Sequence, residues 1–116
     1  MPPPSLTDSL SQSDWFALIN LWLPGRQYMY ANFEISDFIL YVNQCIGQGR
    51  CHVGRTDEVP DALYIWAPDP EFPDTCYFET FVGNTDDIRG FLRDQIKPQY
   101  THFSKHRNGR YKRIKI

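Results

Sequence analysis

The sequence predicts a single α+β domain in which helices pack on a largely antiparallel sheet. Three observations lead to this class: two amphipathic helical segments precede any strand, three strand-like segments follow, and a last helix leads into a C-terminal hairpin. A chain of 116 residues is long enough for one two-layer core and too short for a second. We expect residues 1–12, rich in Pro and Ser, to form a flexible lead and residues 13–116 to form the domain.

Two helices are predicted before the first strand. Ser13 and Asp14 cap the first helix, which Pro24 ends, and Ser36 caps the second, which ends at the glycines at positions 47 and 49. Each helix carries apolar residues at helical spacing, which predicts one buried face apiece. These residues are Trp15, Leu18, Ile19, Trp22 and Leu23 in the first helix, and Phe38, Val42, Cys45 and Ile46 in the second.

Three strands are predicted in the middle of the chain. Residues 50–56 and 61–67 are expected to form a hairpin, with a turn at 57–60. Residues 67–74 contain three prolines, which predicts a loop. Residues 75–82 carry large apolar side chains on both faces, which is typical of a central strand that is covered on both sides.

The chain is expected to end in a helix and a hairpin. Thr85 and Asp86 are candidate caps for the helix, and Pro98 ends it. Asn108 and Gly109 form a strong two-residue turn signal, so the strands on either side of them are expected to pair. The apolar positions of this last helix are Ile88, Phe91, Leu92 and Ile96.

Several classes of protein are excluded by composition. The chain has no run of 18 apolar residues and no signal-peptide pattern, so we expect no membrane span and a cytoplasmic location. Its three cysteines lack C-x-x-C spacing, which indicates neither a disulfide framework nor a zinc site, and no other metal-ligand spacing is present.

Charge is divided unevenly along a chain whose net charge is −2. Residues 105–116 carry six of the twelve Lys and Arg residues and no acid, whereas residues 57–87 carry nine acids and no Lys or Arg. The basic segment is expected to contact an acidic protein, a nucleic acid, or the acidic surface of a second copy in a homo-oligomer; solvated strand faces are the alternative. The candidate partner-binding residues here are Lys105, Arg107, Arg110, Lys112 and Arg113.

The turn from the central strand into the last helix is the best candidate for chemistry. A phosphate cradle needs several glycines and a positive helix start, but here one glycine is followed by two aspartates. The turn is therefore either a capped corner or the place where Asp86 or Asp87 is presented as a catalytic or orienting carboxylate. A catalytic carboxylate needs a base nearby, for which the candidates are His52, His102 and His106.

The segment from Ser36 to Ala67, "SDFILYVNQCIGQGRCHVGRTDEVPDALYIWA", resembles the RTX-toxin-activating lysine acyltransferases. It aligns without a gap with the helix, the strand and the "P-x-A-x-x-x-W-A" strand of that family, and "CYFETFVGNTDD" falls where the family has a strand that ends in an "A-P-F-G-D" turn. The shared positions are Phe38, Val42, Ile46, Asp57, Pro60, Ala62, Trp66 and Ala67.

The resemblance implies an N-acetyltransferase-like fold and transfer of a fatty acyl group from acyl carrier protein to protein lysines. It implies acyl-ACP or acyl-CoA as the donor, no bound cofactor, and Trp66 as a substrate- or partner-contacting residue. The catalytic Asp of the family falls on Asp87 or Asp86, and its early His falls on Tyr30. Since tyrosine is a weak base near neutral pH, we expect an acyltransferase that is catalytically reduced or inactive.

A second resemblance suggests a different role. The stretch "FVGNTDDIRGFL" is similar to the "V-G-N-T-x-x-I-R-x-L" stretch of N-acetyltransferase-like internal virion proteins of T7-like phages. The alternative function is therefore a non-catalytic binding protein with an acyltransferase-like fold, carried in a phage virion or directed against a host system, and located in the virion or the host cytoplasm.

Overall fold

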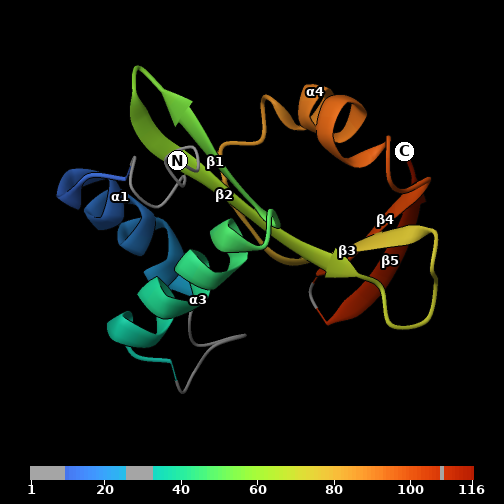
Figure 1. Ribbon diagram of the computed structural model, residues 1–116, viewed down its shortest axis with the longest axis horizontal. Helices are drawn as coiled ribbons and strands as arrows, with labels where there is room; N and C mark the ends of the chain where they lie inside the picture. The colour runs from blue at the N-terminus through green and yellow to red at the C-terminus, as the bar shows by residue number, and fades with distance from the viewer. Residues whose placement is uncertain (1–9, 26–32, 108) are drawn as a thin grey trace, which may run out of the picture.

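The computed structural model of the chain describes residues 10–25, 33–107 and 109–116 (Figure 1). These residues form an α+β fold around a five-stranded sheet in the order β1-β2-β3-β4-β5, which confirms the predicted class. The helical elements are α1 (Gln12–Trp22), η1 (Leu23–Gly25), α3 (Ile35–Gly47), α4 (Ile88–Phe91) and η2 (Leu92–Ile96), and the strands are β1 (Cys51–Thr56), β2 (Val59–Pro68), β3 (Thr75–Gly83), β4 (His102–Arg107) and β5 (Arg110–Lys115).

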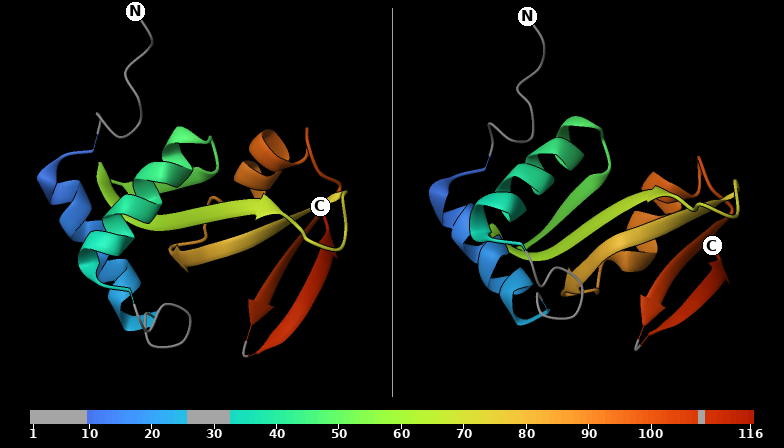
Figure 2. Two further views of the ribbon diagram at one scale, coloured as in Figure 1. Left: turned by 60° about the horizontal axis from the view of Figure 1, so that its bottom comes forward. Right: turned by 90° about the horizontal axis from the view of Figure 1, so that it is seen from below.

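Both predicted hairpins form, and between them lies one parallel pair. Strands β1 and β2 pair antiparallel, as do β2 with β3 and β4 with β5. Strand β4 runs parallel to β3 over three residue pairs only, from Thr75 with His102 to Tyr77 with Ser104. Beyond these pairs the two strands diverge, as Figure 2 shows. A parallel neighbour requires a crossover connection, which α4 and η2 supply.

The core is divided into two clusters that lie on opposite faces of β2. Leu63 and Ile65 pack with α1 and α3, whereas Tyr64 and Trp66 pack with α4 and η2. Because neighbouring residues of a strand point to opposite faces, β2 can serve both clusters at once. The clusters bury all four residues predicted for the face of α3, together with Leu18 and Trp22 of α1 and Phe91 and Ile96 of the last helix.

A bulge in β3 explains why its apolar pattern fits no single face. Ile65 pairs with Thr80 and Trp66 pairs with Phe78, so Glu79 is the extra residue. Past the bulge the alternation of side chains between the two faces shifts by one residue. Phe78 and Phe81 therefore both belong to the cluster that packs with α4 and η2, which we call the α4-side cluster. The Glu79 carboxylate accepts hydrogen bonds from Arg50 at 3.2 Å and from Tyr41 at 3.4 Å.

The helix starts differ from the predicted caps. Helix α1 is capped by Ser11, whose hydroxyl accepts from the Asp14 amide while its own amide donates to the Asp14 carboxylate, and α3 follows Glu34, whose amide donates to Asp37. The predictions of Ser13 and Ser36 are therefore wrong, because an aspartate three residues into each helix selects an earlier start. The last helix begins after Asp87 and not at Thr85 or Asp86.

Two aspartates tie the loop between β2 and β3 to the C-terminal hairpin. Asp69 is buried, and its carboxylate accepts from the hydroxyls of Ser104 and Tyr111, each at 2.6 Å, and from two loop amides. Asp74 forms a bidentate ion pair with Arg113 at 2.7 and 2.9 Å. The described part of the chain contains no helix long and apolar enough to cross a membrane.

Among the glycines compared in the described part of the chain, Gly83 is the one whose replacement should damage the fold most. Its φ is +93°, and a Cβ at this position would lie 2.1 Å from the carbonyl oxygen of Asp61 in β2. We expect Gly83→Ala to lower the free energy of unfolding by more than about 3 kcal/mol in urea denaturation. Gly49→Ala is the matched control, since φ is +72° with nothing within 4 Å, and should cost only about 1–2 kcal/mol. Equal losses would contradict the role of the backbone clash.

Acid should loosen the contact between the loop and the hairpin. Burial alone would raise the pKa of Asp69, but the hydrogen bonds from Ser104, Tyr111 and the loop amides outweigh it and lower the pKa from 3.8 to about 2. The stability that this carboxylate contributes is therefore present above about pH 4 and is lost as the pH falls toward 2. Thermal unfolding should be followed as the pH is lowered from about 4 to about 2. Over this range the Tm of Asp69→Asn should fall less than that of the wild-type protein. The Tm of Asp57→Asn, which alters an exposed carboxylate in a turn, should fall as much as in the wild-type protein.

Candidate functional site

The side chains of His52 and Asp87 meet at the solvent-exposed edge of the α4-side cluster. The His52 imidazole comes from β1 and the Asp87 carboxylate from the residue that precedes α4. The Nε2 atom of His52 lies 3.1 Å from Oδ2 of Asp87, with side chains 32% and 49% exposed. The pair is hydrogen-bonded and still open to solvent, as a site that acts on a bound molecule must be.

Asp87 is held in place by its other carboxylate oxygen and by its backbone. The hydroxyl of Tyr64 donates to Oδ1 at 2.8 Å, and the carbonyl of Asp87 accepts from the Phe91 amide in the first turn of α4. Tyr64 is fully buried. Burial raises the pKa of Tyr64, and its hydrogen bond to Asp87 raises it further, so the phenol remains a proton donor to the carboxylate.

His52 is positioned by ring contacts. Its imidazole stacks on Tyr64, with ring centroids 5.5 Å apart, and lies 4.6 Å from the ring of Phe91. Gly54, two residues further along β1, keeps the space beside the pair open, because a Cβ there would meet Ala62 at 2.9 Å and the Asp87 carboxylate at 3.6 Å. The histidine is thus oriented by the same tyrosine that orients its carboxylate partner.

A small polar cavity of about 210 Å³ adjoins Asp87. A second carboxylate, that of Asp61, lies in its wall and accepts from Thr56 and Asn84. These hydrogen bonds lower the pKa of Asp61 below its ordinary value, and the bond from Thr56 has the larger effect. The described residues contain no group of three or more His, Cys, Asp or Glu side chains arranged to hold a metal ion. The cavity is lined by Gly54, Arg55, Thr56, Asp61, Asn84, Asp86 and Asp87.

The arrangement is suited to moving a proton. An ionised carboxylate only accepts hydrogen bonds, so the contact with Asp87 favours the tautomer of His52 that carries its proton on Nε2. The lone pair then lies on Nδ1, which accepts no hydrogen bond from the residues that the structure describes. An imidazole oriented and electrostatically supported by a carboxylate in this way has the arrangement that general-base catalysis requires.

The structure brings together some of the residues named from the sequence and separates others. Asp87 takes part in the pair, and Asp86 lines the adjoining cavity while its amide donates to Asn84. Trp66 lies in the core, with its ring 5.4 Å from that of Phe91. Tyr30 lies outside the described residues.

One side chain of the basic hairpin, that of Lys105, reaches an aromatic ring next to the site. Lys105 and Lys112 are opposite each other on β4 and β5. The Nζ atom of Lys105 lies 4.8 Å from the ring centroid of Phe81, and Phe81 stacks on Tyr64 at 4.7 Å. Arg110 is exposed, Arg113 is paired with Asp74, and Arg107 belongs to β4 with its side chain outside the described part.

His52 was one of three candidate bases, and only the structure selects it. His102 lies 3.7 Å from Asp74, and His106 contacts Tyr77, so both are engaged at the far hairpin. The register of the β1–β2 hairpin is the one feature that points to His52, because it places this residue opposite Tyr64. Nothing in the local sequence, however, indicates that the chain returns Asp87 to this point 35 residues later.

Comparison with protein-family models finds no match, and neither the curated proteins nor the solved structures include a significant similarity to this chain. The function must therefore be argued from the geometry of the site.

The orientation of His52 can be tested by its tautomer. In ¹⁵N NMR above the titration range of histidine, the wild-type protein should show His52 mainly with its proton on Nε2, because Asp87 accepts from that atom. We expect Asp87→Asn to lose this preference. Asp86→Asn, which changes the neighbouring carboxylate that makes no contact with the imidazole, should retain it. An unchanged tautomer in Asp87→Asn would contradict the proposed orientation.

Proposed function

We propose that the protein is an acyl-ACP-dependent protein-lysine acyltransferase with an N-acetyltransferase-like fold, in which His52 acts as the general base. The observation that carries this proposal is the contact between His52 and Asp87 at 3.1 Å. In the resemblance to toxin-activating acyltransferases, the catalytic His of the family falls on Tyr30 and its catalytic Asp falls on Asp87 or Asp86. His52 supplies an imidazole beside Asp87 from a different position in the chain. The proposed enzyme therefore needs no base from the position of Tyr30.

Acyl transfer to lysine requires a neutral amine, and this is the step that the pair can perform. Nδ1 of His52 removes a proton from the lysine Nζ, whose lone pair then attacks the thioester carbonyl carbon of the donor. The attacking nitrogen releases its second proton to solvent, the carbon–sulfur bond breaks and the amide forms. The departing thiolate takes the proton that His52 returns. The Asp87 carboxylate stabilises the imidazolium that exists between these two transfers, and Tyr64 holds that carboxylate in position.

Features of the fold support this assignment. Helices lie against both faces of a mostly antiparallel sheet, and β3 continues into α4 at the turn that presents Asp87 (Figure 1). That turn holds a single glycine, Gly83, and the carboxylates of Asp86 and Asp87, which would repel the phosphates of acyl-CoA. The charge of the turn therefore favours a donor whose phosphates bind elsewhere, such as acyl-ACP.

The basic hairpin supplies a surface for such a donor. Lys105 and Lys112 are opposite each other, and Lys105 contacts the ring that stacks on Tyr64. Acyl carrier proteins are acidic, so a basic surface beside the site has the sign needed to attract one and orient it.

Acyl transfer measured by mass spectrometry tests the proposal. With acyl-ACP and a lysine-containing peptide, the wild-type protein should produce acyl-lysine, and acyl-CoA should be the poorer donor. His52→Ala and Asp87→Asn should each lower the rate by about 10²- to 10⁴-fold, because both remove general-base catalysis. His102→Ala and Asp86→Asn are matched controls and should stay within a few-fold of wild type. Absence of transfer, or equal rates in all variants, would refute this assignment.

A non-catalytic binding protein, of the phage-virion or host-inhibiting kind, is the second candidate. It is favoured by the other contacts of Asp87. This residue holds the N-cap position of α4, where its carbonyl accepts from the Phe91 amide, and its carboxylate accepts from Tyr64, so it has a structural role as well. In this function the exposed basic side chains of β5, among them Arg110 and Lys112, would bind an acidic protein or a nucleic acid. Absence of acyl transfer, together with a partner that a pull-down retains at low salt and loses at high salt, would select this candidate.

A further inference from the structure

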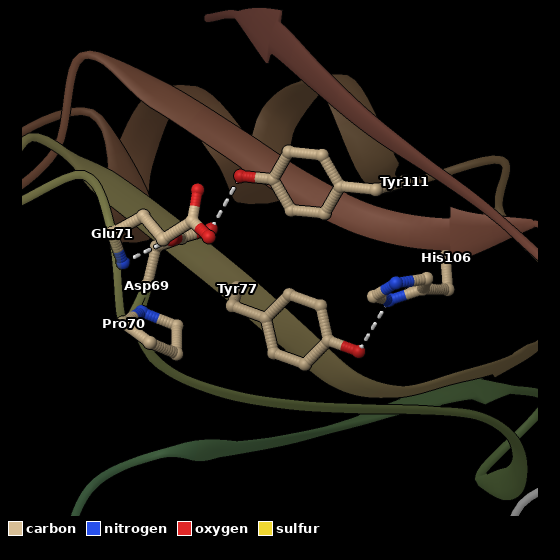
Figure 3. A pocket seen from close by; sticks show the side chains of 6 residues that line it. All are labelled: Asp69, Pro70, Glu71, Tyr77, His106 and Tyr111. Carbon is tan, nitrogen blue, oxygen red and sulfur yellow. Dashed lines mark hydrogen bonds between the residues drawn. The ribbon is translucent and has the colours of Figure 1, made fainter.

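A second, larger cavity of about 520 Å³ lies where β3 and the C-terminal hairpin diverge. It is on the other side of the sheet from His52, because Tyr77 stands between Cys76 and Phe78, whose side chains belong to the α4-side cluster. The acyl-transfer site thus does not include it. The cavity is lined by Asp69, Pro70, Glu71, Tyr77, His106 and Tyr111 (Figure 3).

Hydrogen bonds at their phenol oxygens hold the two tyrosine rings. The hydroxyl of Tyr77 lies 2.9 Å from Nδ1 of His106, and that of Tyr111 donates to Asp69 at 2.6 Å. The His106 ring makes edge contacts with both, at centroid distances of 5.7 and 5.6 Å. Figure 3 shows the two tyrosines side by side, with Asp69, Pro70 and Glu71 beyond one end and His106 beyond the other. The walls of the cavity are therefore rings that are already in position.

The charge of the walls is negative. Asp69 is ionised and buried behind Tyr111, and the exposed carboxylate of Glu71 lies at the rim. On β5, Arg113 lies two residues after Tyr111; it is bidentate to Asp74 and stacks over Phe72, so its charge is already matched. Electron-rich ring faces combined with carboxylates attract cations.

The type of cation follows from the hydrogen bonds of Asp69. Oδ1 accepts from the amides of Glu71 and Phe72, and Oδ2 accepts from Ser104 and Tyr111. A carboxylate has about four lone-pair sites, so Asp69 offers its charge but no further acceptor. At Asp69 an ammonium ion with N–H groups would find no acceptor to replace the water that it loses, and of the two carboxylates only Glu71 could supply one. A quaternary ammonium has no N–H group and needs no acceptor.

We propose that this cavity binds the quaternary ammonium group of a small choline-like molecule. The trimethylammonium group packs against the faces of Tyr77 and Tyr111, and the carboxylates of Asp69 and Glu71 balance its charge. The volume of about 520 Å³ exceeds that of the head group and is in the range of sites that enclose a whole small ligand. Binding here is independent of the proposed acyl transfer.

Calorimetric titration with choline chloride tests the proposal, with 3,3-dimethyl-1-butanol as the uncharged molecule of the same shape and sodium chloride to match ionic strength. We expect choline to bind about 2- to 30-fold more tightly than the alcohol, which lacks the charge. Equal binding of the two, or no binding of choline, would overturn it. A trimethyllysine peptide that binds where choline does not would also overturn it, since the ligand would then be a modified protein.

Variants locate the binding to this cavity. Glu71→Gln, at an exposed position, and Tyr77→Leu should each weaken choline binding by about 2- to 30-fold, and an unchanged circular dichroism spectrum would show that the variants are folded. Glu58→Gln changes an exposed carboxylate in the turn between β1 and β2 and should leave binding as in wild type. His52→Ala should also leave it unchanged, which separates this proposal from the acyltransferase. Retained affinity in folded Glu71→Gln and Tyr77→Leu would refute the assignment.

Discussion

Strand β2 is buried on both of its faces, and the rest of the molecule is arranged around this constraint. Its residues Ala62–Trp66 have at most 8% of their surface exposed. One set of side chains supports α1 and α3, and the alternate set supports α4 and η2. Each helical layer therefore depends in part on the hydrophobic burial that β2 provides.

The same strand positions the candidate site. Tyr64 lies at its centre, and its ring belongs to the core while its hydroxyl reaches the Asp87 carboxylate. Pairing of β1 with β2 sets His52 opposite Tyr64, and the close approach of Gly83 to Asp61 brings the β3 end, and with it Asp87, to the same point. Packing of the core beneath this exposed pair keeps His52 and Asp87 aligned with each other.

Much of the fold could be predicted from the sequence, because the signals involved are local. The apolar spacing of Phe38, Val42, Cys45 and Ile46 correctly indicated the buried face of α3, and the strands of both predicted hairpins pair. The helix starts were misplaced because several serines and aspartates compete as caps, and only backbone geometry shows which one is used. The bulge at Glu79 was also missed, because it is defined by the partner strand.

The sequence by itself determined the α+β class, the order of the elements, the acidic turn that holds Asp87 and the basic hairpin. Only the tertiary structure decided which histidine meets that carboxylate, and that Tyr77, Tyr111 and Asp69 form the walls of one cavity. The physical reason is the range of the interactions. Propensity, periodicity and capping act over a few residues, whereas these contacts join segments about 30 to 40 residues apart, which the pairing and packing of the sheet bring together.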